Sequence, residues 1–198
     1  MSIENSQHLG YEDIGYCALW DARDEAMIDK LLHNIRIGKN KPDTFENKLM
    51  RYYNDQTTDI EPLEMTDPKK DLVVNSGLIR IAQLVTGKSN ATFNSMASGT
   101  GIAGERASDI RLSSENWRVS MISSGYVESV GTVMKFAGKF PTVVPSATIT
   151  ESGAFDTGAA GTGTMLYRTL YPTSATFSHQ QGKTFYSCLQ SINQVSIT

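Results

Sequence analysis

The chain has 198 residues and a formal net charge of −3. This length predicts one domain, or one domain with an appendage, that buries about two thirds of its unfolded surface and needs no cross-links to fold. The charge lacks the basic excess of a nucleic-acid binder, and no segment approaches the ~20 apolar residues of a membrane helix. Hydrophobic residues make up only 39% of the chain. The excess of Gly, Ser, Thr and Asn favours a β-rich fold with many loops.

Residues 1–70 are predicted to be an N-terminal arm and a helical docking region, followed by a polar linker. Residues 1–17 are polar, and they lack the basic head and apolar run of a signal peptide. A helix is expected from Leu19, and the helical stretch 18–53 is interpreted as a docking element. Residues 54–70 are polar and contain two prolines, so they mark the expected boundary. The docking helix has an apolar stripe at i, i+3, i+4 and i+7, formed by Ile28, Leu31, Leu32 and Ile35.

Residues 71–198 are predicted to form one helix followed by an antiparallel β-sandwich of jelly-roll or immunoglobulin-like type. The helix is expected over 76–86, with Asn75 or Ser76 as its cap and Gly87 at its end. Its expected packing stripe consists of Leu78, Ile81, Ala82 and Val85. Short apolar runs between turn residues predict strands at 91–98, 116–123, 126–137, 146–155, 164–171 and 183–197.

The residues that bind metals in other proteins are sparse in this chain. Cys17 and Cys188 lie far apart, and neither has a second ligand at a metal-binding spacing. Both have apolar neighbours, which is typical of buried thiols, and a single bridge between them is left open. Asp29 and His33 share one face of the expected first helix, but the sequence offers no third ligand. We therefore expect no metal and no cofactor.

Three glycines, Gly99, Gly101 and Gly104, spell G-x-G-x-x-G, the pattern of a dinucleotide-binding turn. That function needs a following helix with an apolar stripe and an acidic residue about 20 positions on. The next stretch has too few apolar residues for such a helix, and Ser-Ser-Gly stands where the acid is required. The glycines are therefore interpreted as a structural turn that uses positive φ angles.

Two charged residues, Glu151 and Arg168, stand inside otherwise apolar predicted strands. An unpaired buried charge costs several kcal/mol, so each is expected to pair with the other or with backbone amides. Glu151 and Asp156 flank Gly153, and an alternative interpretation makes them a glycosidase-like carboxylate pair. The aromatic residues of the last third are interpreted as core and subunit interface, with a carbohydrate-binding platform as the alternative. They are Tyr167, Tyr171, Phe177, Phe185 and Tyr186.

Five blocks of sequence follow one another within residues 71–198. They are L-V-V-N-S-G-L at 72–78 with its helical continuation, A-x-G-T-G at 97–101, A-x-D-x-x-L-x-x-E at 107–115, I-x-E-x-G-x-F at 149–155 and G-T-M-L-x-R at 163–168. In this order and spacing they resemble a family of tailed-virus structural proteins, the phage tail or tail-fibre-like proteins. The chain departs from the family pattern at Ala154, where Leu is more frequent, and residues 1–70 have no counterpart.

The resemblance implies a non-enzymatic β-sandwich that is built into the tail, baseplate or fibre apparatus of a virion. Its implied partners are other virion proteins and copies of itself, without nucleic acid or membrane. Assembly in the host cytoplasm implies unpaired cysteines. It further implies that the turn at 99–101 packs where a strand leaves the sheet, and that Asp109 caps or braces the following loop. The alternatives are a head-decoration or neck protein of the same fold, and a carbohydrate-binding module for host glycans.

Overall fold

The computed structural model describes residues 11–26, 62–66, 69–70, 72–121, 123–127, 133–172 and 176–194. In these residues the chain is mainly β, with antiparallel sheets and one longer helix, α3 (Asn75–Val85). No helix in this part of the chain is long and apolar enough to cross a membrane. Several expected residues lie outside the described ranges, namely Ile28, Asp29, Leu31, Leu32, His33 and Ile35.

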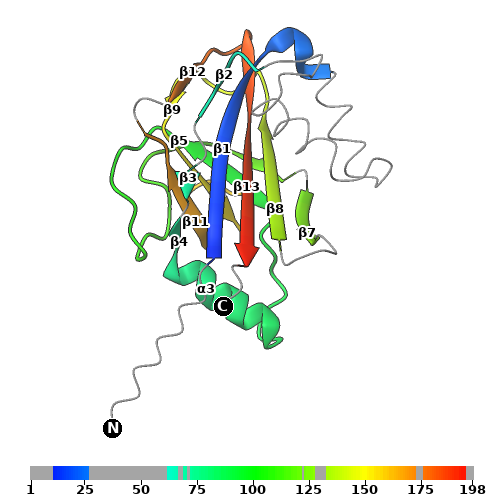
Figure 1. Cartoon of the computed structure of the whole chain (residues 1–198), viewed down its shortest axis with the longest axis vertical. Helices are drawn as coiled ribbons and strands as arrows, with labels where there is room; N and C mark the ends of the chain where they lie inside the picture. Colours follow the sequence, from blue (N-terminus) through cyan, green and yellow to red (C-terminus); the bar gives the residue numbers. More distant parts are fainter. Residues whose placement is uncertain are drawn as a thin grey trace.

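The larger sheet contains six of the described strands. Its order is β2 (Glu64–Met65), β1 (Tyr11–Asp21), β13 (Thr184–Gln194), β8 (Val133–Phe140) and β7 (Ser123–Val127), and β3 (Lys69–Lys70) also pairs with β1. The three long strands β1, β13 and β8 run side by side (Figure 1). This sheet therefore takes strands from both sides of the boundary expected near residue 70.

Strand β1 corrects two expectations for the N-terminal region. Residues 11–17 are not a separate arm, because β1 pairs with β13 along its whole length. Residues 19–21 continue the same strand and do not begin a helix; a short 3-10 turn, η1 (Ala22–Asp24), follows them. The physical reason is a run of four consecutive buried residues, which suits a strand covered on both faces better than an amphipathic helix. The run is Cys17, Ala18, Leu19 and Trp20.

The second sheet has five described strands in the order β4 (Leu72–Val73), β11 (Met165–Leu170), β10 (Glu151–Phe155), β5 (Ser95–Gly99) and β6 (Glu115–Ser120). A separate pair consists of β9 (Ala147–Ile149) and β12 (Phe177–His179). Each predicted strand overlaps an observed one. However, the predicted strand 126–137 covers parts of β7 and β8, and 146–155 divides at Thr150 into β9 and β10, which pair in different sheets.

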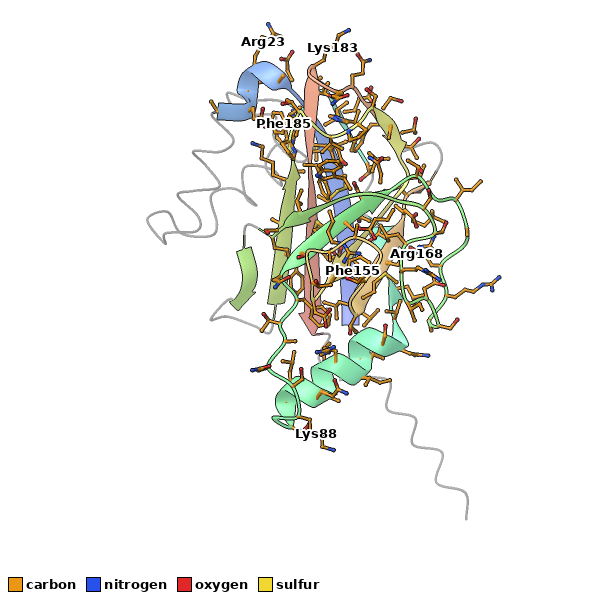
Figure 2. The ribbon with its side chains drawn as sticks, turned by 180° about the vertical axis from the view of Figure 1, so that it is seen from behind. Arg23, Lys88, Phe155, Arg168, Lys183 and Phe185 are labelled. Atoms are coloured by element: carbon orange, nitrogen blue, oxygen red, sulfur yellow. A yellow bond between two sulfur atoms is a disulfide. The ribbon has the colours of Figure 1, made fainter. Side chains whose placement is uncertain are left out.

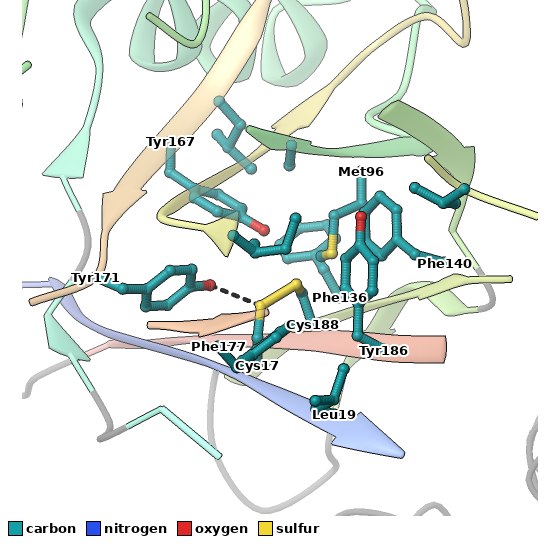
Figure 3. Close-up of a cluster of buried hydrophobic side chains, with 14 of the residues drawn as sticks. Cys17, Leu19, Met96, Phe136, Phe140, Tyr167, Tyr171, Phe177, Tyr186 and Cys188 are labelled. Carbon is teal, nitrogen blue, oxygen red and sulfur yellow. Dashed lines mark hydrogen bonds between the residues drawn. A yellow bond between two sulfur atoms is a disulfide. The ribbon is translucent and has the colours of Figure 1, made fainter. Parts of the chain in front are cut away.

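One buried cluster contains side chains of both sheets and forms the main core (Figure 3). Phe140 and Tyr186 stack with ring centroids 4.5 Å apart, and Met96 of the smaller sheet lies beside Gly138 of β8. The aromatic residues predicted to fill a core, Tyr167, Tyr171, Phe177, Phe185 and Tyr186, are all buried. Cys17 and Cys188 belong to this region and form a disulfide between β1 and β13. The resemblance implied free thiols, and the structure corrects that implication.

Helix α3 begins and ends within one residue of its predicted bounds, but only part of its predicted stripe packs. A Cβ on Gly77 would lie only 2.4 Å from the Leu166 carbonyl oxygen, so this glycine marks the contact with β11. Ile81 of the predicted stripe packs against the main core, whereas Leu78 is 44% exposed and Val85 83% exposed. The expected cap is also absent, because the N-cap is Val74 without a side-chain bond, and Ser76 instead donates to Met165 O.

His179 on β12 is buried, and two hydrogen bonds fix its ring. Its Nε2 lies 2.9 Å from Val144 O, an atom that can only accept, so Nε2 carries the proton, while Nδ1 lies 3.0 Å from Thr184 Oγ1. Burial lowers the pKa of the imidazole, and the bond to Val144 offsets this only in part. In the unfolded chain this histidine takes up a proton near pH ~6.5, whereas in the folded chain it stays neutral to a lower pH. Its contribution to the free energy of unfolding is therefore fully present above about pH 6.5 and is lost as the pH falls below that value.

The substitution His179→Gln is expected to flatten this pH dependence. Glutamine can still donate to the Val144 carbonyl but takes up no proton. Between about pH 7.5 and about pH 5.5, the Tm of the native sequence should fall by roughly 2–4 °C more than that of the variant. Carboxylates and the other histidines titrate in both proteins, so their effects cancel in the difference. Equal losses of Tm in the two proteins would contradict the prediction that folding keeps His179 neutral.

Candidate functional site

On one face of the smaller sheet, two small residues lie side by side. Ala97 on β5 and Gly153 on β10 are register partners, with Arg118 and Arg168 as their partners on the neighbouring strands. The loop 100–114, between β5 and β6, packs its buried Leu112 against them. A second, smaller core forms there from Val74, Ala97, Leu112, Phe155 and Met165. Seen from behind, this sheet lies in front of β1 and β13, with Phe155 and Arg168 near its middle (Figure 2).

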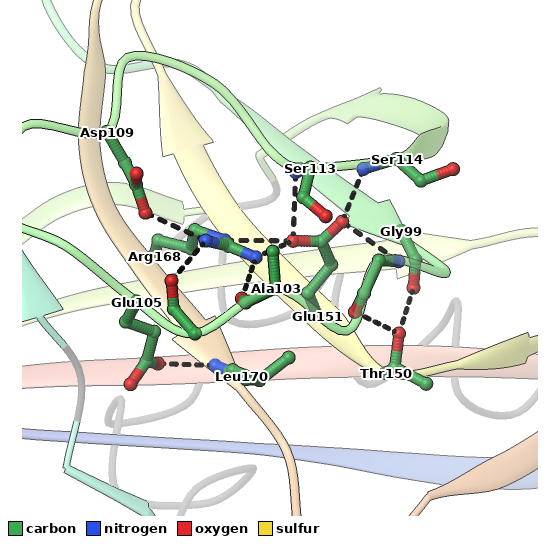
Figure 4. Close-up of polar contacts among 12 residues, drawn as sticks. Gly99, Ala103, Glu105, Asp109, Ser113, Ser114, Thr150, Glu151, Arg168 and Leu170 are labelled. Atoms are coloured by element: carbon green, nitrogen blue, oxygen red, sulfur yellow. Dashed lines mark hydrogen bonds and ion pairs between the residues drawn. The ribbon is translucent and has the colours of Figure 1, made fainter.

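Glu151, at the start of β10, holds the loop through its carboxylate. Oε1 accepts hydrogen bonds from the backbone N–H groups of Gly101 at 3.0 Å and Ser114 at 2.8 Å. Oε2 accepts one from the N–H of Ser113 at 3.1 Å and one from Arg168 Nε at 2.9 Å, and it forms an ion pair with Arg168 Nη2 at 2.8 Å. The side chain is fully buried. One carboxylate thus joins both ends of the loop to the sheet (Figure 4).

Arg168 on β11 is the positive centre of this network, which we call the Glu151–Arg168 network. Besides Glu151, its guanidinium donates to the Asp109 carboxylate at 2.7 Å and to the carbonyls of Ala103 and Gly104. Burial opposes its charge, yet the hydrogen bonds with Asp109 and Glu151 raise the pKa of Arg168 above its ordinary value. All three nitrogens of its guanidinium therefore have acceptors within the chain itself.

Arg118 on β6 organises the neighbouring loop, 156–164, between β10 and β11. Its Nη2 forms an ion pair with Glu115 at 2.7 Å, and its guanidinium lies 3.7 Å from the centre of the Phe155 ring. Its Nη1 lies within 3.0 Å of three backbone carbonyl oxygens, those of Thr157, Ala159 and Thr162. The Arg118 guanidinium is therefore surrounded by backbone carbonyl oxygens of the loop 156–164, and it holds this loop against the sheet.

The two carboxylates of the alternative glycosidase-like pair both have partners within the chain. Glu151 belongs to the network described above. Asp156 forms an ion pair with Arg80 of α3 at 2.8 Å and accepts the backbone N–H of Thr164 at 2.7 Å. Gly153 between them lies inside strand β10 and marks no bend.

The three glycines of the G-x-G-x-x-G pattern serve the loop in different ways. None has a positive φ angle, so the prediction of left-handed glycines is wrong here; positive φ occurs at Gly87, Gly161, Gly163 and Gly182. Gly99 and Gly101 instead leave space for the Glu151 side chain. A Cβ would lie 2.7 Å from its Oε1 at the first position and 2.3 Å at the second. At Gly104 a Cβ would meet no neighbouring atom within 4 Å.

A matched pair of substitutions tests this interpretation. Gly101→Ala is expected to lower the free energy of unfolding by about 2–3 kcal/mol, because the carboxylate must leave its bonds to admit the methyl group. Gly104→Ala should change it by less than about 0.5 kcal/mol, because the added methyl group meets open space. Urea unfolding of both variants measures the difference. A comparable loss in both would argue against the steric role of Gly101.

A hollow of about 620 Å³ opens between the loops 100–114 and 156–164. Arg168, Asp109 and Glu115 line it, and each is already paired, Glu115 with Arg118. No described group of three or more His, Cys, Asp or Glu side chains is placed to hold a metal ion. These three paired side chains are thus engaged in fixing two loops to the sheet, and Arg106 and Arg111 also line the hollow.

The sequence indicated Glu151 and Arg168 but missed the groups that complete their network. The amides of Ser113 and Ser114 carry no sequence signal, because any residue supplies a backbone N–H. Arg118 was also missed, because it stands at a polar position of the alternating stretch 116–120, where the sequence predicts an exposed side chain. No protein-family model, curated protein or solved structure matches this chain.

Proposed function

We propose that the chain is a non-enzymatic structural component of a tailed-virus particle, assembled into the tail, baseplate or fibre apparatus, and that its two sheets form a β-sandwich. The proposal starts from the five sequence blocks that resemble the tail-protein family. The single observation that supports it best is where the residues of those blocks lie. Each of the five blocks contributes one residue to the small core, namely Val74, Ala97, Leu112, Phe155 and Met165, and Glu151 and Arg168 of the last two blocks form the network beside it.

The chemistry of this assembly favours a structural role. A catalytic or ligand-binding site keeps charged atoms directed at a space that the substrate enters. Here the two oxygens of Glu151 accept four hydrogen bonds from the chain and make one further ion-pair contact, and every nitrogen of the Arg168 guanidinium has an acceptor within the chain. The blocks therefore specify a fold and a rigid loop.

Exposed apolar side chains support assembly with neighbours. Ile102 is 78% exposed and Ile110 62% exposed, both on the loop that Glu151 holds. Leu78, Ile79 and Val85 stand exposed on one side of α3. Large apolar side chains on rigid elements are a feature of subunit contacts, and repeated copies around a symmetry axis fit such a component.

Mass spectrometry of purified particles tests the proposal. The chain should be present in a fixed ratio to the major structural proteins and should stay with the particles through a density gradient. Its absence from washed particles would overturn the proposal. Antibody labelling of whole particles would then separate a tail position from the head-decoration or neck alternative.

The carbohydrate-binding alternative loses the residues on which it depended. Tyr167, Tyr171 and Tyr186 are each at most 3% exposed, so they offer no stacking surface to a sugar. No described residue set favours this alternative over the structural role.

A further inference from the structure

We propose that the Cys17–Cys188 disulfide is a lock that closes after the chain has folded, and that its redox state controls the local opening of strand β1. The inference concerns this chain alone and does not depend on the proposed function. It follows from the place of the two cysteines in the sheet, from the pairing of β1, and from the burial of both sulfur atoms.

The fold itself places the two sulfur atoms side by side. Cys17 and Cys188 are direct partners in the register of β1 and β13, with Cα atoms 4.1 Å apart. The backbone of Cys17 turns away from β13, because its N–H donates to Thr66 Oγ1 at 2.8 Å and its carbonyl accepts from Thr66 N at 2.9 Å. The pair is therefore of the non-hydrogen-bonded kind, in which opposing side chains approach most closely. No backbone rearrangement is needed to join them.

The sheet does not need the bond in order to form. The pairing of β1 with β13 extends over eleven residues and includes ten positions other than Cys17. The core around the sulfur atoms is made of large aromatic and aliphatic side chains, among which a thiol packs as a small apolar group. The dithiol chain should therefore reach the same fold, and oxidation should follow folding.

Strand β1 is the element that the bond secures. On the side away from β13, the described partners of β1 are only the two-residue strands β2 and β3. Without the disulfide, β1 can separate from the sheet by breaking one long ladder and these two short ones. With the disulfide, its centre is tied to β13, and separation requires β13 to move as well.

Tyr171 connects the lock to the second sheet. Its hydroxyl lies 3.0 Å from Cys17 Sγ (Figure 3). It also lies 2.7 Å from Ser152 Oγ. A disulfide sulfur carries no proton, so Tyr171 donates to it. The sulfur pair thus has a polar neighbour in the core in both redox states.

The oxidation has a defined balance. Two Sγ–H bonds and the S–S bond of one oxidised glutathione break, while one Sγ–Sγ bond and two glutathione thiols form. The two electrons and both protons pass to glutathione, through a mixed disulfide on one cysteine. Cys17 and Cys188 are 0% and 1% exposed, so the oxidant reaches them only when β1 opens. The closing rate should therefore follow the opening of β1.

Hydrogen–deuterium exchange of the full chain, read by mass spectrometry in the reduced and oxidised states, tests the proposal. The reduced chain should be folded by circular dichroism. Oxidation should slow exchange of peptides within 11–21 by about tenfold or more, and leave peptides of β10 and β11 within about twofold. The double variant Cys17→Ala/Cys188→Ala should match the reduced chain and should not respond to oxidised glutathione.

Three results would overturn the proposal. If the reduced chain failed to fold, the disulfide would be a requirement of folding. If oxidation slowed exchange equally in all peptides, the disulfide would stabilise the whole fold and not strand β1 in particular. No slowing in peptides of 11–21 would show that β1 is not what it holds.

Discussion

Replacing Glu151 by glutamine should lower the free energy of unfolding by about 3–5 kcal/mol, although the two side chains have nearly the same shape. Both oxygens of Glu151 accept hydrogen bonds, and all their partners are donors. The amide NH₂ of glutamine must replace one oxygen. It then faces either the amides of Gly101 and Ser114, or the amide of Ser113 and the Arg168 guanidinium. In each orientation the NH₂ group faces other N–H groups in a buried site, and no hydrogen bond can form there. Arg168 also loses the negative charge of the Glu151 carboxylate.

Urea unfolding measures this effect, with Glu64→Gln as the matched control. Glu64 lies exposed on β2, so the same chemical change there should alter stability by less than about 0.5 kcal/mol. Similar unfolding midpoints for the two variants would mean that the Glu151–Arg168 network contributes little to the fold. A lower midpoint for Glu151→Gln alone would support the network as the element that closes the loop 100–114.

Arg118→Met should lower the free energy of unfolding by about 2–4 kcal/mol and loosen the loop 156–164. Methionine keeps much of the apolar stem and the contact with the Phe155 ring. It leaves three inward-pointing carbonyl groups and the Glu115 carboxylate without their cation. The loop should therefore open to solvent before the sheet unfolds.

Two measurements separate these effects. Thermal unfolding gives the loss of stability, and limited proteolysis locates new cleavage within 156–164. The control is Arg106→Met, because Arg106 lies exposed on the loop 100–114 and its removal should leave both readouts unchanged. Protection of 156–164 in Arg118→Met equal to that of the native chain would contradict the role assigned to Arg118.

The elements that the sequence predicts best are those whose pattern is local. Helix α3 and most of the strands after it agree with the structure to within a few residues. The exceptions are the predicted strand 126–137, which joins parts of β7 and β8, and β12, for which no strand was predicted. The pairing of the interior charges Glu151 and Arg168 could be predicted because a buried charge needs an opposite charge or hydrogen-bond partners. The sequence could not reveal that backbone amides of the loop 100–114 are also partners of Glu151, since every non-proline residue has such an amide.

The features that the sequence does not predict depend on distant partners. Strand β1 contains acidic residues in its first half and adjoins an apolar stripe of helical period, so its pairing with β13 carries no local signal. The packing face of α3 was predicted correctly only at Ile81, while Leu78 and Val85 are exposed, because Gly77, which makes the close contact, has no side chain to indicate a face. The pairing of Cys17 with Cys188 requires the register of two strands that lie 171 residues apart.

The adjacency of β1 and β13 has a consequence for how the chain is made. A ribosome that adds about 5–20 residues per second needs roughly 10–35 s to pass from one strand to the other. During this interval β1 has emerged, but the neighbour that covers its length does not yet exist. The central part of the larger sheet can therefore form only after β13 has been synthesised, and the nascent chain must keep an apolar strand unpaired until then.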